Sequence, residues 1–392
     1  MMDARSLLQA AQGFFPWLSD TYRDFHRYPE TAHHEIETNR RIRAQLDALH
    51  VSYLMPAENI TIAVLDSGKP GPCVGLRCDT DALPVQEDTG LPYASAHDGV
   101  MHACGHDAHI TIGLGAARLL SARSQDWRGR VKIIFQPAEE GENGADEVIA
   151  TGLVDDVDAF FAIHAWSPYP TGTIHLSPIT VAAAVDMFTI RITGQGGHGA
   201  TPEKCRDALV AGAALVNALQ TVVSRSVSPM VPAVLTIGSF HAGTVGNIIA
   251  QEAELRGTLR ALDNETAAHL RAEMARIAEQ TAQAFGCTAN IFYHCRQDAV
   301  VNDAGLCETA LSCAADLLPA DKIGPQAPMM LGDDFSAYRR IAPACYAHVG
   351  IADEALQTCA AHHNGKFRVD ESVLPLCAAW MAAFVDAVGR NK

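Results

Sequence analysis

The stretch from Met101 to His109 carries the densest group of potential metal ligands in this chain. It reads Met-His-Ala-Cys-Gly-His-Asp-Ala-His, so one thiol, three imidazoles and one carboxylate fall within nine residues. Cys104 and His106 flank a single glycine, and an apolar run that is typical of a helix follows them. A turn at the start of a helix can direct a thiolate and an imidazole at one point. These groups bind zinc, and together with carboxylates they also suit manganese or cobalt.

Further donors follow three short runs that are typical of β-strands. The runs are 73–78, 131–136 and 159–163, and the donors after them are Asp79, Asp81, Glu139, Glu140 and His164. Open α/β sheets bind their ligands beyond the carboxyl ends of the strands. We therefore expect these side chains to lie near the Cys104 turn.

Two metal ions need about five to seven donors, and the sequence offers a candidate set for them. The set is Cys104, His106, Glu140, His164 and His363. Hydrolysis of an amide also needs a base that does not bind metal. Since Glu139 and Glu140 are adjacent, Glu140 can bind metal while Glu139 takes a proton from the attacking water and passes it to the leaving nitrogen. Asp81 is expected to orient one of the metal ligands without binding the metal itself.

The order of elements predicts an α/β fold with a mainly parallel sheet and an inserted second domain. Two helices are expected within residues 3–49, and strands then alternate with helices up to about residue 185. Residues 186–296 read as β-α-β-β-α-β, a ferredoxin-like unit. The predicted organisation is a catalytic domain in two parts, 1–185 and 297–392, with a lid or dimerisation domain at 186–296.

Composition narrows the class of protein. The 392 residues have a formal net charge of −16 without a basic stripe, which argues against nucleic acid and against an anionic membrane surface. The 11 cysteines contain no Cys-x-x-Cys pair and favour a reducing compartment. Met1-Met2-Asp3-Ala4-Arg5 does not resemble a signal peptide, and no apolar run of about 18 residues is evident. We expect a cytoplasmic protein.

Less specific interpretations stay open for several residues. A single histidine or a Glu-Glu pair is usually structural or solvated, and most of the cysteines are expected to be small core residues. The structural interpretation is kept for His33, His34, His97, His109, His175, His241, His294 and His348. Asp333-Asp334 is either a helix cap or part of a site.

Taken in order, the motifs resemble the dinuclear metallopeptidase and amidohydrolase family that includes aminoacylases and carboxypeptidase G. Within it, the chain is most similar to the branch of hippurate hydrolases, indole-acetyl-amino-acid hydrolases and N-acyl-amino-acid deacetylases. The resemblance runs nearly end to end, and the cysteine in the metal motif points to this branch. The motifs are His26-Arg27-Tyr28-Pro29-Glu30, Asp79-Thr80-Asp81-Ala82-Leu83-Pro84, 101–107, Pro137-Ala138-Glu139-Glu140-Gly141, Gly197-His198-Gly199-Ala200, Asn247-Ile248-Ile249 and 367–371.

The resemblance implies roles for individual residues. It matches the five candidate donors to metal ligands and Glu139 to the general base, and it favours His363 over His362 because the ligand lies four residues before the phenylalanine, here Phe367. His198 matches a lid histidine that approaches the oxyanion, often across a dimer. Asn247 matches a lid residue near the substrate.

Three positions depart from the family pattern, and they are Glu203, Ala250 and Asp333. The first two lie in the lid, so they bear on the substrate and on the dimer contact rather than on the metals.

The resulting expectation is an enzyme that cleaves the amide bond of an N-acyl amino acid, using water activated by two divalent ions (zinc, manganese or cobalt). Arg260 and the metals are candidates for holding the substrate carboxylate. A homodimer or higher homo-oligomer through the lid is expected. The alternatives are a dipeptidase or carboxypeptidase of the same family, and a non-catalytic relative that binds small amides.

Overall fold

The computed structural model describes residues 3–141 and 143–391. Met1 and Met2, which belong to the segment judged for a signal peptide, lie outside the described residues. The chain forms two compact units. The larger unit comprises the described parts of 1–179, 301–327 and 334–392, and the smaller comprises 180–300 and 328–333. The domain ranges 1–185, 186–296 and 297–392 remain a prediction. They differ from these units at the two junctions, and the smaller unit also includes 328–333, which lies within the predicted range 297–392.

The larger unit is built on an eight-stranded sheet with the order β1-β2-β4-β3-β5-β16-β6-β15. The central strands β4, β3, β5 and β16 run parallel to one another, and β1 and β2 add an antiparallel edge. The strands are β1 Ser52–Ala57, β2 Ile60–Asp66, β3 Cys73–Asp79, β4 Arg130–Gln136, β5 Ala159–Pro170, β6 Ile174–His175, β15 Ile323–Gly324 and β16 Ala344–Ala352. Strand β3 is buried along its whole length, as expected for a parallel strand that is covered on both faces.

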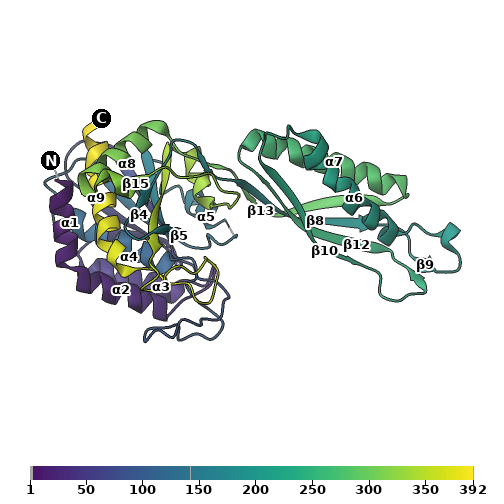
Figure 1. The fold of residues 1–392 in the computed structure, drawn as a ribbon, viewed down its shortest axis with the longest axis horizontal. Coiled ribbons are helices and arrows are strands. Elements are labelled where there is room, and N and C mark those ends of the chain that lie inside the picture. Colours follow the sequence, from purple (N-terminus) through teal and green to yellow (C-terminus); the bar gives the residue numbers. More distant parts are fainter. Residues whose placement is uncertain (1–2, 142, 392) are drawn as a thin grey trace. The chain divides into compact units, whose positions relative to one another are not determined.

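Helices pack against this sheet, and the apolar core lies between them (Figure 1). Helix α4 contacts β3 and α9, while α1 and α2 also pack against α9. The helices are α1 Ala4–Gly13, α2 Phe15–Arg27, α3 Ile36–Ala48, α4 His106–Ser121, α5 Gly144–Ala150, α8 Ala304–Leu317 and α9 Leu374–Asn391, with short 3-10 turns η2 Ala320–Lys322, η3 Asp334–Arg340 and η4 Glu371–Val373. Trp380 and Phe384 of α9 pack on Phe161 of β5.

The N-terminal segment contains one more helix than the sequence pattern predicts. Two helices were expected within residues 3–49, but the structure has α1, α2 and α3. The first predicted helix is interrupted at Phe14, whose backbone is not helical, and α2 restarts with Pro16 in its first turn. Proline has no N–H to continue a helical ladder and is well tolerated in a first turn, which accounts for the break.

The smaller unit is a four-stranded antiparallel sheet with two long helices on one face (Figure 1). Its sheet order is β10-β12-β8-β13. The elements are β7 Thr180–Ala182, β8 Ala184–Thr193, β9 Gly197–His198, η1 Pro202–Lys204, α6 Ala208–Ser226, β10 Ala233–Ala242, β11 Ile248–Ile249, β12 Glu252–Ala261, α7 Asn264–Ala284 and β13 Thr288–Gln297, followed by β14 Val300–Val301 at the junction. The predicted class, α/β with an inserted ferredoxin-like unit, is confirmed.

Two helices are long and apolar enough to cross a membrane by length and composition, namely α6 and the segment Glu371–Arg390 that contains α9. Most of the second segment is buried inside the larger unit, where it forms part of the core. The core helix of a folded domain passes the same test, so these two helices are weak grounds for a membrane span.

Candidate metal centre

The candidate ligands of the larger unit come together because neighbouring parallel strands end at the same edge. Asp79 at the end of β3 lies opposite Gln136 at the end of β4, so the segments that carry Asp81 and Glu139-Glu140 leave the sheet side by side. His164 lies on β5, the other neighbour of β3. His106 is the first residue of α4, and the preceding Gly105 has a φ of 93° that favours glycine.

Cys104 lies between two histidines. Its Sγ atom is 3.6 Å from Nε2 of His164 and 3.6 Å from Nδ1 of His362. Nδ1 of His164 donates to the carbonyl of Ala165, so Nε2 carries no proton in the neutral ring and its lone pair can bind a metal. In His362, Nε2 accepts the N–H of Ser167, so the proton of the neutral ring is assigned to Nδ1, which faces the sulfur. His362 is therefore a hydrogen-bond donor to Cys104 rather than a ligand.

His106 and Glu140 present atoms that are suited to a cation. Nδ1 of His106 donates to the backbone carbonyl of Asp81 at 2.8 Å, which directs Nε2 to the other side. Among the described residues, Nε2 of His106 has no hydrogen-bond partner, and it lies 4.0 Å from Oε1 of Glu140. Nε2 of His363 lies 3.1 Å from the same Oε1 and makes an ion pair when its ring is charged. Buried polar atoms of this kind need a partner.

Glu139 lies beside this group. Its Oε2 atom is 4.0 Å from Nε2 of His106, and its side chain is largely buried. The Asp81 carboxylate accepts the N–H groups of both Glu139 and Glu140 at 3.0 Å. Asp81 thus contacts His106 and also fixes the backbone of the two adjacent glutamates.

The electrostatics of the centre favour a bound cation. Burial disfavours the charged form of His106, yet Asp79, Asp81 and Glu140 raise its pKa to about 10. Burial, followed by the charges of Glu140, Glu139 and Asp79, raises the pKa of the Cys104 thiol well above its usual value. Burial lowers the pKa of His164, so its ring is neutral. A divalent cation would offset the negative charge and stabilise the Cys104 thiolate.

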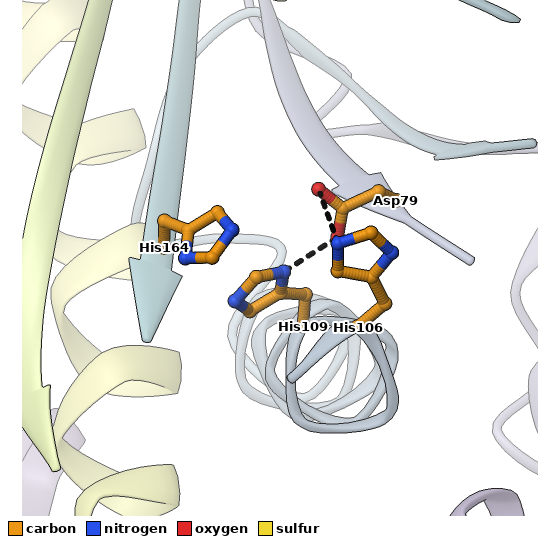
Figure 2. Close-up of side chains that lie close together, drawn as sticks. All are labelled: Asp79, His106, His109 and His164. Atoms are coloured by element: carbon orange, nitrogen blue, oxygen red, sulfur yellow. Dashed lines mark hydrogen bonds and ion pairs between the residues drawn. The ribbon is translucent and has the colours of Figure 1, made fainter. Parts of the chain in front are cut away.

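His109 lies in the same cluster but is already engaged at both ring nitrogens. Asp79, His106, His109 and His164 are close enough to resemble a second ligand group (Figure 2). However, Nδ1 of His109 donates to Asp79, and Nε2 accepts the N–H of Ala165 at 2.9 Å. The ring thereby links Asp79 of β3 to Ala165 of β5. We assign His109 to support of the ligands, because binding a metal would break one of these bonds.

A buried ion network supports Asp79, the residue that binds His109. Arg77 of β3 donates to Asp79, Asp334 and Gln136, and all four side chains are almost fully buried. Asp334 also accepts the N–H of Ala145 at the start of α5. Asp334 therefore takes part in this ion network of the larger unit. This contact bears on whether Asp333-Asp334 is a helix cap or part of the site.

The residues present fit a metal centre with thiol, imidazole and carboxylate donors. Cys104, His106 and Glu140 form one compact group, with His164 next to Cys104 and His363 next to Glu140. These donor types suit zinc, manganese or cobalt. The ligand assignments themselves remain predictions.

The three remaining predicted site residues lie in the smaller unit. His198 of β9 pairs with Ile248 of β11, and the carbonyl of Asn247 accepts the N–H of Gly199, so His198 and Asn247 share one short exposed ribbon. Arg260 lies on β12 and donates to the carbonyl of Met330 at 2.7 Å. It lines a cavity of about 440 Å³ on the face of the sheet, together with Arg256 and other residues.

The supporting residues were largely missed at the level of the sequence. Asp79 was noted only as a group at a strand end, and His109 was given a structural role. Its position three residues after His106 places both on one face of α4, and this spacing is the signal that could have found it. No comparable signal marks the contacts of Arg77 with Gln136 and Asp334, or those of His362 with Cys104 and Ser167, because these partners are distant in sequence.

Comparison with known proteins identifies the family of this chain. The pattern of peptidase family M20/M25/M40 matches residues 75–387. An N-acetyl-L-cysteine deacetylase of Bacillus subtilis is 36% identical over 90% of this chain and 83% of its own. The IAA-amino acid hydrolase ILR1-like 6 of Arabidopsis thaliana is 36% identical over 96% of this chain and 81% of its own. The crystal structure of Bacillus subtilis YXEP, a dinuclear metal-binding peptidase, superposes with a TM-score of 0.84 at 32% identity and covers 97% of this chain and all of its own. On this evidence of pattern, sequence and fold, the chain belongs to the peptidase family M20/M25/M40.

Proposed function

We propose that this protein is a metal-dependent amidohydrolase that cleaves the amide bond of N-acyl amino acids. The observation that carries the proposal is the position of Glu139. It is a buried carboxylate 4.0 Å from the free nitrogen of His106, and the adjacent Glu140 provides a separate carboxylate for a metal. A centre that only stores metal does not need this second carboxylate, whereas hydrolysis needs a base that is not a ligand.

The candidate ligands are Cys104, His106, Glu140, His164 and His363, and two divalent ions would be held among them. Bound metal would lower the pKa of a water molecule and polarise the substrate carbonyl. Glu139 would accept the proton of that water and return it to the leaving nitrogen. Asp81 would keep Glu139 and Glu140 in register through their backbone N–H groups. The test described below compares zinc, manganese and cobalt to identify the metal.

The substrate class is supported by the two relatives, whose names refer to N-acetyl-L-cysteine and to amino acid conjugates of IAA. Both substrates join an acyl group to an amino acid through an amide. The acyl group accepted by this chain is open among acetyl, benzoyl, indole-acetyl and longer groups. The product pair would be a carboxylic acid and a free amino acid.

We assign recognition of the substrate to the smaller unit. Arg260 lines a cavity beside Arg256 and His294, and burial lowers its pKa, so its charge gains from a carboxylate partner. His198 would stabilise the oxyanion, and Asn247 on the same ribbon would contact the substrate. We further propose that the smaller unit forms a homodimer or higher homo-oligomer, and that the protein is cytoplasmic without a nucleic acid or membrane partner.

A second candidate function is that of a dipeptidase or carboxypeptidase. It is favoured by the description of the YXEP relative as a peptidase. The difference lies in whether the substrate must carry a free α-amino group. A non-catalytic amide-binding role is disfavoured, because such a protein has no need for the buried Glu139.

The test is hydrolysis of a panel of N-acetyl, benzoyl and indole-acetyl amino acids and of dipeptides by protein stripped of metal and reloaded with zinc, manganese or cobalt. Metal-restored release of the amino acid from an acyl conjugate supports the proposal. Cleavage of dipeptides alone would replace it with the peptidase function. Stoichiometric metal binding without turnover of any substrate would contradict both.

A further inference from the structure

The turn that carries Glu139 and Glu140 has an unusual backbone. Ala138 and Asn143 adopt φ angles of 53° and 57°, in the left-handed region that side chains other than glycine rarely adopt. Gly144 closes the turn by donating its N–H to the carbonyl of Ala138, and a Cβ atom there would collide with Pro137. A backbone of this kind persists only when its surroundings restrain it.

The restraint comes from two buried carboxyl groups that are distant in sequence. The N–H of Ala138 donates to Oε1 of Glu35 at 2.8 Å. The N–H groups of Glu139 and Glu140 donate to the two oxygens of Asp81 at 3.0 Å each. Three successive N–H groups of the turn are therefore held by Glu35 and Asp81.

Glu35 directs its side chain to this turn rather than to its own helix. It occupies the N-cap position of α3, where a side chain often accepts N–H groups of the first turn, yet it makes no such bond. Its residue is fully buried, and Oε2 has no hydrogen-bond partner among the described residues. Burying a carboxyl group without full hydrogen bonding is unfavourable, and a purely structural N-cap would not require it.

We propose that Glu35 is a positioning residue of the metal centre, which sets the places of Glu139 and Glu140 by holding the N–H of Ala138. This inference rests on the function proposed for those two glutamates. Glu35 touches neither metal nor substrate, so it acts through the turn. Asp81 holds the following two N–H groups, and the two carboxyl groups together prevent the turn from relaxing toward a right-handed backbone.

The property that matters is the acceptor atom Oε1. Burial and then the charge of Asp81 raise the pKa of Glu35 to about 8, and the neutral carboxyl retains this acceptor. Glutamine also retains it, whereas methionine has a similar length without it. Aspartate keeps the carboxyl group but is shorter by one methylene and does not reach Ala138.

The experiment compares Glu35→Gln, Glu35→Met and Glu35→Asp with a matched control, Leu46→Ala. Leu46 is buried on the same helix and is part of the core, so its truncation weakens α3 without removing a bond to the turn. Each protein is measured for zinc affinity by competition with a chromophoric chelator, for kcat and KM on the best acyl amino acid, and for hydrogen exchange of the peptide that spans the turn.

We expect Glu35→Met and Glu35→Asp to lose about 10- to 100-fold in zinc affinity and in kcat, with KM changed less, and to exchange the turn amides faster. Glu35→Gln stays within about threefold of the wild type, and Leu46→Ala lowers the melting temperature while zinc affinity and turn exchange are retained.

The inference is overturned if Glu35→Asp, the variant with the smaller change, keeps wild-type zinc affinity and turn exchange. It is equally overturned if Glu35→Gln loses as much as Glu35→Met. If the wild type cleaves no acyl amino acid, the proposed function fails, but zinc affinity and turn exchange still decide the role of Glu35. Aggregation of Glu35→Met alone leaves this decision to Glu35→Asp and Glu35→Gln.

Discussion

His26 of α2 is the centre of a buried ion triad whose contribution to stability depends on pH. Its Nδ1 atom lies 2.6 Å from Oδ2 of Asp107, and its Nε2 atom lies 3.3 Å from Oε1 of Glu87. Burial disfavours the charged imidazole, yet the hydrogen bonds to these two carboxylates raise the pKa of His26 from 6.5 to about 9. Burial disfavours the charged form of Glu87, yet hydrogen bonds from His26, from the N–H of Ser95 and from the hydroxyl of Thr89 lower its pKa to about 2.

A pKa that is higher by about 2.5 in the folded state corresponds to about 3 kcal/mol of stability. Because the folded pKa of His26 is raised, this contribution is complete below about pH 6.5 and is lost as the pH rises through about 9. The substitution His26→Gln removes the titrating group and keeps a donor for Asp107. The destabilisation that it causes should therefore be larger at pH 6 than at pH 10, by about 3 kcal/mol.

Urea unfolding of the wild type and of His26→Gln at both pH values measures this difference, with a chelator present so that metal binding does not contribute. Taking the difference between the two proteins cancels the titration of groups that they share. An equal destabilisation at pH 6 and pH 10 would refute the assignment of a charged His26. A larger destabilisation at pH 10 would reverse the sign and refute it as well.

Three further outcomes follow from the centre and its support. Cys104→Ser should weaken zinc binding by at least about tenfold and flatten its increase with pH, measured by chelator competition, because the thiol no longer has to lose a proton. Arg77→Met should lower the free energy of unfolding by about 3–5 kcal/mol in urea, since it leaves Asp79 and Asp334 buried without their cation. Gly105→Ala should cost about 1–2 kcal/mol in the same assay through its left-handed backbone, and unchanged stability would contradict that strain.

The fold could be predicted from the sequence where the patterns are local. The inserted ferredoxin-like unit follows from alternating strands and long amphipathic helices, and the main parallel strands are short apolar runs followed by polar turns. The short edge strand β1 was not predicted, because most of its residues are exposed and it contains Pro56. Helix α5 was not predicted either, since it is only seven residues long.

Some residues of the candidate centre could likewise be predicted from the sequence, and others could not. Cys104 and His106 are chemically distinctive and lie at the start of a helix, so spacing and residue type suffice to propose them. His164 was expected just after a strand that ends at residue 163, but β5 continues to Pro170 and His164 lies within it. The role of Glu35 has no signal in the sequence, because its hydrogen bond with Ala138 joins residues 103 positions apart and involves only a backbone N–H. Side-chain to backbone contacts of this length leave no periodic pattern, and only the folded structure reveals them.

The most direct test of the central claim is the turnover of Glu139→Gln loaded with metal, measured on the best acyl amino acid and accompanied by its metal content and melting temperature. We expect this variant to fold and bind metal like the wild type, while kcat falls by at least about 100-fold because the base is lost. Near-normal turnover by a folded, fully loaded Glu139→Gln would contradict the assignment of Glu139 as the general base, and with it the mechanism proposed for this centre.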